Sequence, residues 1–394
     1  MNIDGLLQLG RSLFVVLLII VVPLPGLAGA RLGDAEPGSR RSGRDFPVNL
    51  QYPNVCEQWQ FDARSPMASS PAVAEGRVFA GDGAGKMRAL SLRSGAPEWE
   101  LTAGGPIRST PVADGRRVVF ASVDGSLYAL QTSTGKKLWQ FATEKPIVAS
   151  PCITNNMIYI DAGDGKFRAL DLAEGKLVWE FPGAGGFVET RPLVCNGRVI
   201  FGSGDGYLYA LDEATGQLAW KWQGKGSGDL GAMCLPAAFW PVAAERRLFV
   251  VAPDRVLTAL GLAKGNEIWR ADAWQVCEST GLARDGSRCY ARTMTNGVIV
   301  AFATGADHAA KLWELDARLG CDSNAAMLAE KHGVLYYGTG NGLLLAIDPR
   351  SGTLLWEHKL GVTVLNTVVP LEDANEVLVS DADGKITRVG PRRH

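Results

Sequence analysis

The 394-residue sequence lacks most of the side-chain patterns that mark a catalytic centre. It has seven cysteines but no C-x-x-C and no C-x-x-C-H, so the usual marks of a thioredoxin-like or haem site are absent. Its four histidines follow no metal-ligand spacing, and no Walker loop, G-x-G-x-x-G after a strand or Ser/His/Asp arrangement is found. We therefore predict no catalytic residue and no dedicated metal site.

The balance of charges argues against nucleic-acid-binding proteins. The net charge is −1, and acidic and basic residues are mixed along the chain, which gives no electrostatic case for nucleic-acid binding.

The N-terminus is typical of an export signal over residues 1–30. Its uncharged apolar stretch, residues 13–30, ends in an A-x-A pattern at Ala30, which predicts cleavage there. The alternative is that this stretch stays as a membrane anchor. Residues 31–54, rich in Gly, Ser, Arg, Asp and Pro, are predicted to form a flexible linker before a domain over residues 55–391. We expect an exported, periplasmic or otherwise extracytoplasmic protein.

What the sequence does contain is a repeat with a period of about 40 residues. In each copy a Gly stands six residues, and a Trp ten residues, after an Ala. A further copy, from Ala301 to Trp313, has an insertion and loses the Gly. The in-register copies are Ala89/Gly95/Trp99, Ala129/Gly135/Trp139, Ala169/Gly175/Trp179, Ala210/Gly216/Trp220, Ala259/Gly265/Trp269 and Ala346/Gly352/Trp356.

Each copy is predicted to form four antiparallel strands. Short β-rich runs are separated by turn residues at roughly ten-residue spacing, and Asp-Gly or Asn-Gly pairs favour tight hairpins. One such sheet cannot bury both faces, so the copies must pack around an axis as an all-β propeller. We expect each Trp to dock between blades, with the small Ala and Gly leaving room and a backbone acceptor for the indole N–H. These structural tryptophans are Trp59, Trp99, Trp139, Trp179, Trp220, Trp269, Trp313 and Trp356.

The number of these tryptophans predicts eight blades. Seven end complete blades, and the last copy stops before any Trp. The missing strand is the one around Trp59, so the N-terminal strand is predicted to close the ring.

One candidate site lines the predicted central channel. Aligning the blade starts places Arg108, Glu189, Glu278 and roughly Asn324 at equivalent positions beside the axis. Such a mixed ring suits an anionic or metal-assisted ligand. The alternative, which we favour, is solvated channel charge held in salt bridges.

A second candidate is an interaction surface on blades five to seven, which depart from the template by longer loops. Insertions within a repeat map to loops on one face, often the binding face. Its candidate contacts are Asp229, Trp240, Trp274 and Asp322.

The cysteines divide into two groups. Cys152, Cys195 and Cys289 fall in or beside strand runs and are predicted to be buried, inert thiols. Cys234, Cys277 and Cys321 precede first strands of consecutive blades, so a disulfide between neighbours is a further hypothesis for an exported protein.

The recurring Asp/Asn-Gly-x-Leu-Tyr-Ala-Leu-Asp-x-x-Thr-Gly-x-x-x-Trp resembles the repeat of the pyrroloquinoline-quinone (PQQ)-like, quinoprotein/BamB-like family of eight-bladed propellers. The resemblance covers about residues 56–390. It implies either a non-enzymatic scaffold similar to BamB, with an envelope protein as partner, or a quinoprotein dehydrogenase. A ligand-sensing propeller is a third reading. We expect a monomer that meets the membrane only through its N-terminal segment.

The dehydrogenase reading would require PQQ and Ca²⁺ in the channel. The resemblance would then make Glu189 or Glu278 a metal ligand or base, Asn324 a ligand, and Arg108 the partner of a quinone carboxylate. Dehydrogenases of this family are longer and carry adjacent cysteines, which this chain lacks. Its size and minimal blades resemble BamB more closely, although the lipidated cysteine of BamB has no counterpart at residue 30. We therefore expect a scaffold without a cofactor.

Overall fold

A computed structural model describes residues 52, 54–185, 191–226, 241–320, 322, 324, 326–373 and 375–392, with the side chains of residues 278–279 excepted. The chain divides into a unit of residues 1–41, which lies outside the described residues, and a unit of residues 42–394. The described part of the second unit contains strands and no helix. It accordingly offers no helix that is long and apolar enough to cross a membrane.

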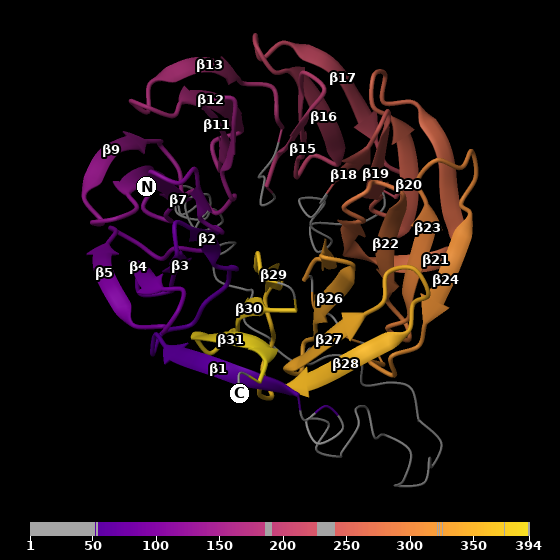
Figure 1. Cartoon of the computed structure of the whole chain (residues 1–394). Helices are drawn as coiled ribbons and strands as arrows, with labels where there is room; N and C mark the ends of the chain where they lie inside the picture. Colours follow the sequence, from indigo (N-terminus) through magenta and orange to yellow (C-terminus); the bar gives the residue numbers. More distant parts are fainter. Residues whose placement is uncertain are drawn as a thin grey trace, which may run out of the picture. The chain divides into compact units, whose positions relative to one another are not determined.

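The strands form four-stranded antiparallel blades, which Figure 1 shows arranged radially within this unit. Blade 1 contains β2 (Ala72–Ala74), β3 (Arg77–Gly81), β4 (Lys86–Ser91) and β5 (Pro97–Thr102). Blade 2 contains β6 (Val112–Ala113), β7 (Arg117–Ala121), β8 (Ser126–Gln131) and β9 (Lys137–Ala142). Blade 3 contains β10 (Cys152–Thr154), β11 (Met157–Ala162), β12 (Lys166–Asp171) and β13 (Leu177–Phe181), and blade 4 contains β14 (Leu193–Cys195), β15 (Arg198–Gly202), β16 (Tyr207–Asp212) and β17 (Leu218–Gln223).

The second half of the ring follows the same plan. Blade 5 contains β18 (Val242–Ala244), β19 (Arg247–Val251), β20 (Val256–Gly261) and the start of β21 (Glu267–Leu282), and blade 6 contains the end of β21, β22 (Arg288–Thr293), β23 (Ile299–Ala303) and β24 (Lys311–Leu315). Blade 7 contains β25 (Ala329–Lys331), β26 (Val334–Gly338), β27 (Leu343–Ile347) and β28 (Leu354–Lys359), and blade 8 contains β29 (Val369–Pro370), β30 (Val377–Ser380), β31 (Lys385–Pro391) and β1 (Val55–Asp62).

Two features fix the number of blades. Strand β21 is shared: Trp269 pairs with β20, whereas Leu282 pairs with β22, so blades 5 and 6 form one continuous seven-stranded sheet. At the other end of the chain, β1 pairs antiparallel with β31, from Val55 opposite Pro391 to Asp62 opposite Lys385. The predicted eight-bladed propeller closed by its N-terminal strand is confirmed. The fusion of two blades through β21 was not predicted.

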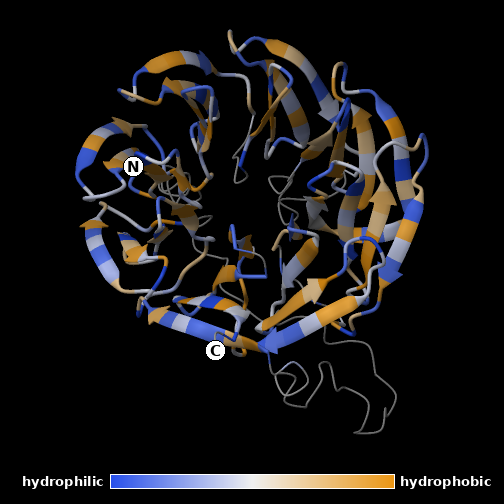
Figure 2. Cartoon of the chain, viewed as in Figure 1, coloured by the Kyte–Doolittle hydropathy of each residue, from blue (hydrophilic) through white to orange (hydrophobic). Residues whose placement is uncertain are grey.

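The core lies between adjacent blades. The middle strands are buried almost throughout, as in β7 and β8, whereas outer strands such as β9 alternate between exposed and half-buried residues. Figure 2 shows this alternation as bands along the outer strands. Side chains of neighbouring blades interdigitate. Val119 and Leu127 of blade 2, for example, pack in one cluster with Ile158 and Leu170 of blade 3.

Each docking Trp joins its blade to the next one. In seven cases the indole Nε1 donates to a backbone carbonyl of the following blade over 2.8–3.1 Å. In most of these contacts a Gly with positive φ of the following blade lies under the ring. A Cβ added to Gly135 would stand 2.6 Å from the Trp99 indole, so no larger residue fits. The donor–acceptor pairs are Trp59–Leu92, Trp99–Thr132, Trp139–Leu172, Trp179–Glu213, Trp220–Leu262, Trp269–Ala306 and Trp313–Pro349.

The closing blade has an additional buried latch. Arg388 stands opposite Trp59 in the β1–β31 pair, at the position that Ala occupies in the repeat motif. Its guanidinium donates to the Leu92 carbonyl of blade 1 over 2.8 Å, the same carbonyl that accepts from Trp59, and forms an ion pair with Glu376. Gln58 of β1 donates to the other carboxylate oxygen of Glu376 over 3.0 Å. The latch therefore joins β1, the C-terminal strands and blade 1.

Candidate functional site

The predicted channel position is occupied by a clasp between blades at Asn324. Its Nδ2 donates to the Gly338 carbonyl of its own blade and to the Leu365 carbonyl that leads into blade 8, both over 2.8 Å. The backbone carbonyl of Asn324 accepts a hydrogen bond from the Arg292 guanidinium over 2.8 Å. Asn324 is 8 % exposed. One N–H of the amide thus fixes the side chain to blade 7, and the other joins it to the segment that leads into blade 8.

A second asparagine, Asn366, makes the same type of contact at the next seam. Its Nδ2 lies 3.3 Å from the carbonyls of Met67 and Ser69 in the segment leading into blade 1, and 2.9 Å from Ser380 Oγ. Asn366 was missed in the sequence, although the segment that leads into its blade could have been aligned with the one that contains Arg108. The two clasps secure the seams on either side of the closing blade.

The other predicted channel residues do not form a defined group in the described structure. Arg108 is exposed, Glu189 lies outside the described residues, and Glu278 lies in β21 with a side chain outside them. Among the described residues no group of three or more His, Cys, Asp or Glu side chains is positioned to hold a metal ion. The atom of Asn324 that could bind Ca²⁺ is Oδ1, which accepts from the Ala326 amide over 3.3 Å, whereas the Nδ2 donors face two backbone carbonyls.

Two residues of the predicted interaction surface are engaged locally. Trp274 is half-buried and packs edge-on against Phe302, with ring centroids 5.3 Å apart. Asp322 accepts from the Gly340 amide over 3.2 Å and from the Tyr337 hydroxyl over 3.2 Å. Asp229 and Trp240 lie outside the described residues.

Burial lowers the reactivity of the cysteines in the strands. Burial raises the pKa of the Cys152 and Cys289 thiols, and that of Cys195 to about 11. A thiol with a raised pKa is a poor nucleophile at neutral pH. Cys234 and Cys321 lie outside the described residues, so the disulfide between neighbouring blades stays a prediction.

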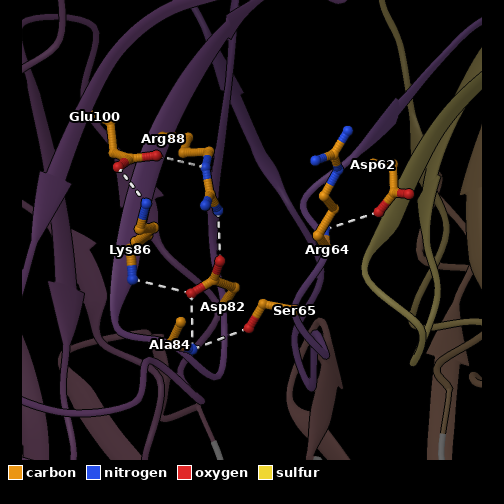
Figure 3. A network of polar contacts seen from close by, with 8 residues as sticks. All are labelled: Asp62, Arg64, Ser65, Asp82, Ala84, Lys86, Arg88 and Glu100. Atoms are coloured by element: carbon orange, nitrogen blue, oxygen red, sulfur yellow. Dashed lines mark hydrogen bonds and ion pairs between the residues drawn. The ribbon is translucent and has the colours of Figure 1, made fainter.

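Several charged side chains outside the predicted sites organise hairpin turns. In Figure 3, Asp82 accepts from the amides of Ala84 and Lys86, each over 2.9 Å, and pairs with Arg88. Arg88 also donates to Glu100 over 2.8 Å. The hydrogen bond from Lys86, with the charges of Arg88 and Lys86, lowers the pKa of Glu100 although burial opposes the shift. This network braces the β3–β4 hairpin.

A similar network braces the turns of blades 2, 3 and 4, with a tyrosine in place of the arginine in two of them. In blade 3 an arginine again pairs with the turn aspartate and with a glutamate of the outer strand, whereas in blades 2 and 4 a tyrosine hydroxyl reaches the turn aspartate over 2.6 Å. The residues are Asp164, Arg168 and Glu180 in blade 3, Asp124 and Tyr128 in blade 2, and Asp205 and Tyr209 in blade 4.

Two buried charges stand apart from these networks. Asp161 in β11 and Arg292 in β22 are each 1 % exposed, near the ends of second strands where Gly81 and Ala121 stand in blades 1 and 2. Within the described part of the chain, both carboxylate oxygens of Asp161 and one guanidinium nitrogen of Arg292 have no hydrogen-bond partner. Burial, reinforced by the charge of Asp164 and opposed by that of Arg168, raises the pKa of Asp161 well above its ordinary value.

Comparisons with known proteins agree with this geometry. The family model described as "Outer membrane protein assembly factor BamB" matches residues 56–182, 146–238, 183–320 and 295–391. No curated protein sequence matches the chain significantly. The chain is similar to the crystal structure of BamB from Moraxella catarrhalis, with a TM-score of 0.67, 18 % identity, and coverage of 86 % of this chain and 98 % of that one.

Two further solved structures share the fold. One is the computationally designed Ika8 protein, with a TM-score of 0.71, 18 % identity, and coverage of 84 % of this chain and 98 % of that one. The other is the quinohemoprotein alcohol dehydrogenase from Comamonas testosteroni, with a TM-score of 0.70, 12 % identity, and coverage of 86 % and 77 %. At these identities the similarity shows the fold and not the activity.

The strands, the docking tryptophans and the shared closing blade define the molecule as an eight-bladed β-propeller of PQQ-like repeats. Because the family model matches along residues 56–391, the chain belongs to the BamB family of these propellers. The predicted family is confirmed.

Proposed function

We propose that this protein is an exported, non-catalytic propeller that serves as a protein-interaction scaffold in the cell envelope. The family match along residues 56–391 carries the proposal, since the family is named for assembly of outer membrane proteins. The predicted export signal over residues 1–30 agrees with a periplasmic location.

The second candidate is a small quinoprotein dehydrogenase, which the shared fold with a quinohemoprotein alcohol dehydrogenase favours. Bound PQQ would supply oxidation of an alcohol or sugar. Of the residues predicted to hold it, Arg108 is the one whose exposed cationic side chain agrees with a carboxylate partner.

One experiment separates the two candidates. Purified full-length protein is incubated with PQQ and Ca²⁺, freed of unbound cofactor, and examined for a quinone spectrum and for dye reduction with alcohols and sugars. Crosslinking in intact cells is run in parallel. We expect no stoichiometric quinone and a crosslinked envelope protein. Retained quinone with turnover would replace the scaffold by the dehydrogenase, and retained quinone without turnover would indicate a sensor.

A further inference from the structure

A groove opens on the seam between blades 1 and 2. Its volume is about 480 Å³, and it lies beside the point where the Trp99 indole donates to Thr132. Glu75, in the β2–β3 turn, contributes the wall from blade 1, and the other lining residues belong to blade 2. We call this groove, lined by Glu75, Arg116, Arg117, Gln131, Thr132, Ser133, Lys136 and Leu138, the basic groove.

The corresponding place is bridged at two other seams. Asn155 holds the same turn position in blade 3 as Glu75 in blade 1, two residues before the second strand, and donates to Glu213 of blade 4 over 2.8 Å. Asn196, its equivalent in blade 4, donates to the Glu245 carbonyl in the β18–β19 turn of blade 5 over 3.1 Å, so this seam is bridged from turn to turn. At the basic groove the equivalent of Glu213 is Thr132. Its hydroxyl turns back to the Gly115 carbonyl of its own blade over 2.8 Å, and the seam stays open.

The groove presents charges that the described chain leaves unsatisfied. Arg117 is paired with Asp114 over 3.0 Å. The side chains of Arg116 and Lys136 are exposed, and neither has a hydrogen bond or ion pair within the described residues. Leu138 beside them is 45 % exposed. The apolar residues that precede the docking Trp in blades 3, 6 and 7 are similarly exposed, but of these residues Leu138 alone lines the basic groove beside the two cations. Free cations next to an exposed apolar side chain match a ligand that carries both carboxylates and apolar groups.

We propose that the basic groove binds an acidic segment of a partner protein, whose carboxylates pair with Arg116 and Lys136 and whose apolar side chain covers Leu138. The proposal rests on the scaffold function and names the partner chemistry for it. The lining favours a peptide over a phosphate-rich polymer. Glu75 can accept from the N–H groups that a peptide has and a phosphate chain lacks, and Leu138 offers an apolar contact that a phosphate chain cannot use.

The test measures binding of a fluorescein-labelled peptide of alternating Asp and Leu to the purified full-length protein by fluorescence anisotropy. Its Asn–Leu analogue serves as the uncharged probe. We expect saturable binding of the acidic peptide that weakens with salt, and about tenfold weaker binding to Arg116→Glu/Lys136→Glu. Leu138→Ser should weaken binding severalfold at unchanged salt dependence. The control is Lys176→Glu, at the position in blade 3 that Lys136 holds in blade 2, where the lysine is paired with Glu174 over 2.6 Å.

Circular dichroism confirms that each variant is folded. Equal affinity of the double variant and the wild type, equal binding of the Asn–Leu analogue, or displacement of the peptide by tripolyphosphate at equimolar concentration would each overturn the proposal. The envelope crosslink separates this result from the scaffold function. A partner captured equally by the wild type and the double variant retains the scaffold and rejects the basic groove as its site.

Discussion

The ring should depend on the buried ion pair of its closing blade. Arg388 and Glu376 have side chains only 5 % and 7 % exposed, so replacing Arg388 with Met removes the guanidinium that neutralises the buried Glu376 carboxylate. Gln58 supplies one remaining hydrogen bond, and the Leu92 carbonyl keeps its bond from Trp59. Breaking a buried pair in this way costs about 3–5 kcal/mol. We therefore expect Arg388→Met to lower the free energy of unfolding by that amount.

The matched control is the exposed pair of Arg77 and Glu98, whose atoms lie 2.6 Å apart with side chains 24 % and 32 % exposed. Water screens this pair, so Arg77→Met should cost less than about 1 kcal/mol. Urea midpoints followed by tryptophan fluorescence give the comparison, provided that the slope is unchanged between variants. Equal losses in Arg388→Met and Arg77→Met would refute the argument that the latch closes the ring.

Three further predictions concern the docking contacts and the buried polar groups. Gly135→Ala should cost about 2–4 kcal/mol, because it adds a clash with Trp99 to the strain of positive φ. Gly197→Ala, with the same φ but open space around it, should cost only about 1 kcal/mol; equal urea midpoints would contradict the clash. The raised pKa of Asp161 predicts that the native state holds a proton that the unfolded chain loses above about pH 4. The free energy of unfolding of the wild type should therefore fall relative to that of Asp161→Asn as pH rises from about 4 towards the native pKa. The fall is at most about 1.4 kcal/mol per pH unit. Urea midpoints of the two proteins that change in parallel with pH would contradict this. Asn324→Asp should cost about 2–4 kcal/mol with or without Ca²⁺, since it places carboxylate oxygens against two carbonyls; stabilisation by Ca²⁺ would instead indicate a metal ligand.

The sequence predicts the fold because the repeat encodes contacts that are nearly identical at each seam. A large indole, a Gly that must adopt positive φ and a fixed spacing specify one way for consecutive blades to meet. The count of tryptophans then requires the strand around Trp59 to complete the last blade. The fusion through β21 was not predictable in the same way. Whether a segment between blades continues as a strand depends on how two sheets are placed, and the stretch around Cys277 departs from the repeat template.

The candidate site was less predictable, because alignment gives a residue's position but not its partners. Asn324 and Arg108 occupy corresponding places, yet one is buried in a clasp and the other is exposed. Arg388 could not be found by alignment, because it replaces the small Ala of the motif in the one copy that is split between the chain ends. Its importance appears only when β1 is paired with β31.

Deviations from the repeat therefore carry the information that the repeat itself lacks. Where the seam between blades 3 and 4 is bridged by Asn155 and Glu213, the polar groups of the two blades are used for a contact between them. Where Glu75 and Thr132 replace that pair, the same backbone leaves a groove with uncompensated cations. Eight nearly equivalent seams provide internal controls for one another. A binding surface on this propeller should thus be sought at the seam whose polar groups the neighbouring blade does not satisfy, and the basic groove meets that condition.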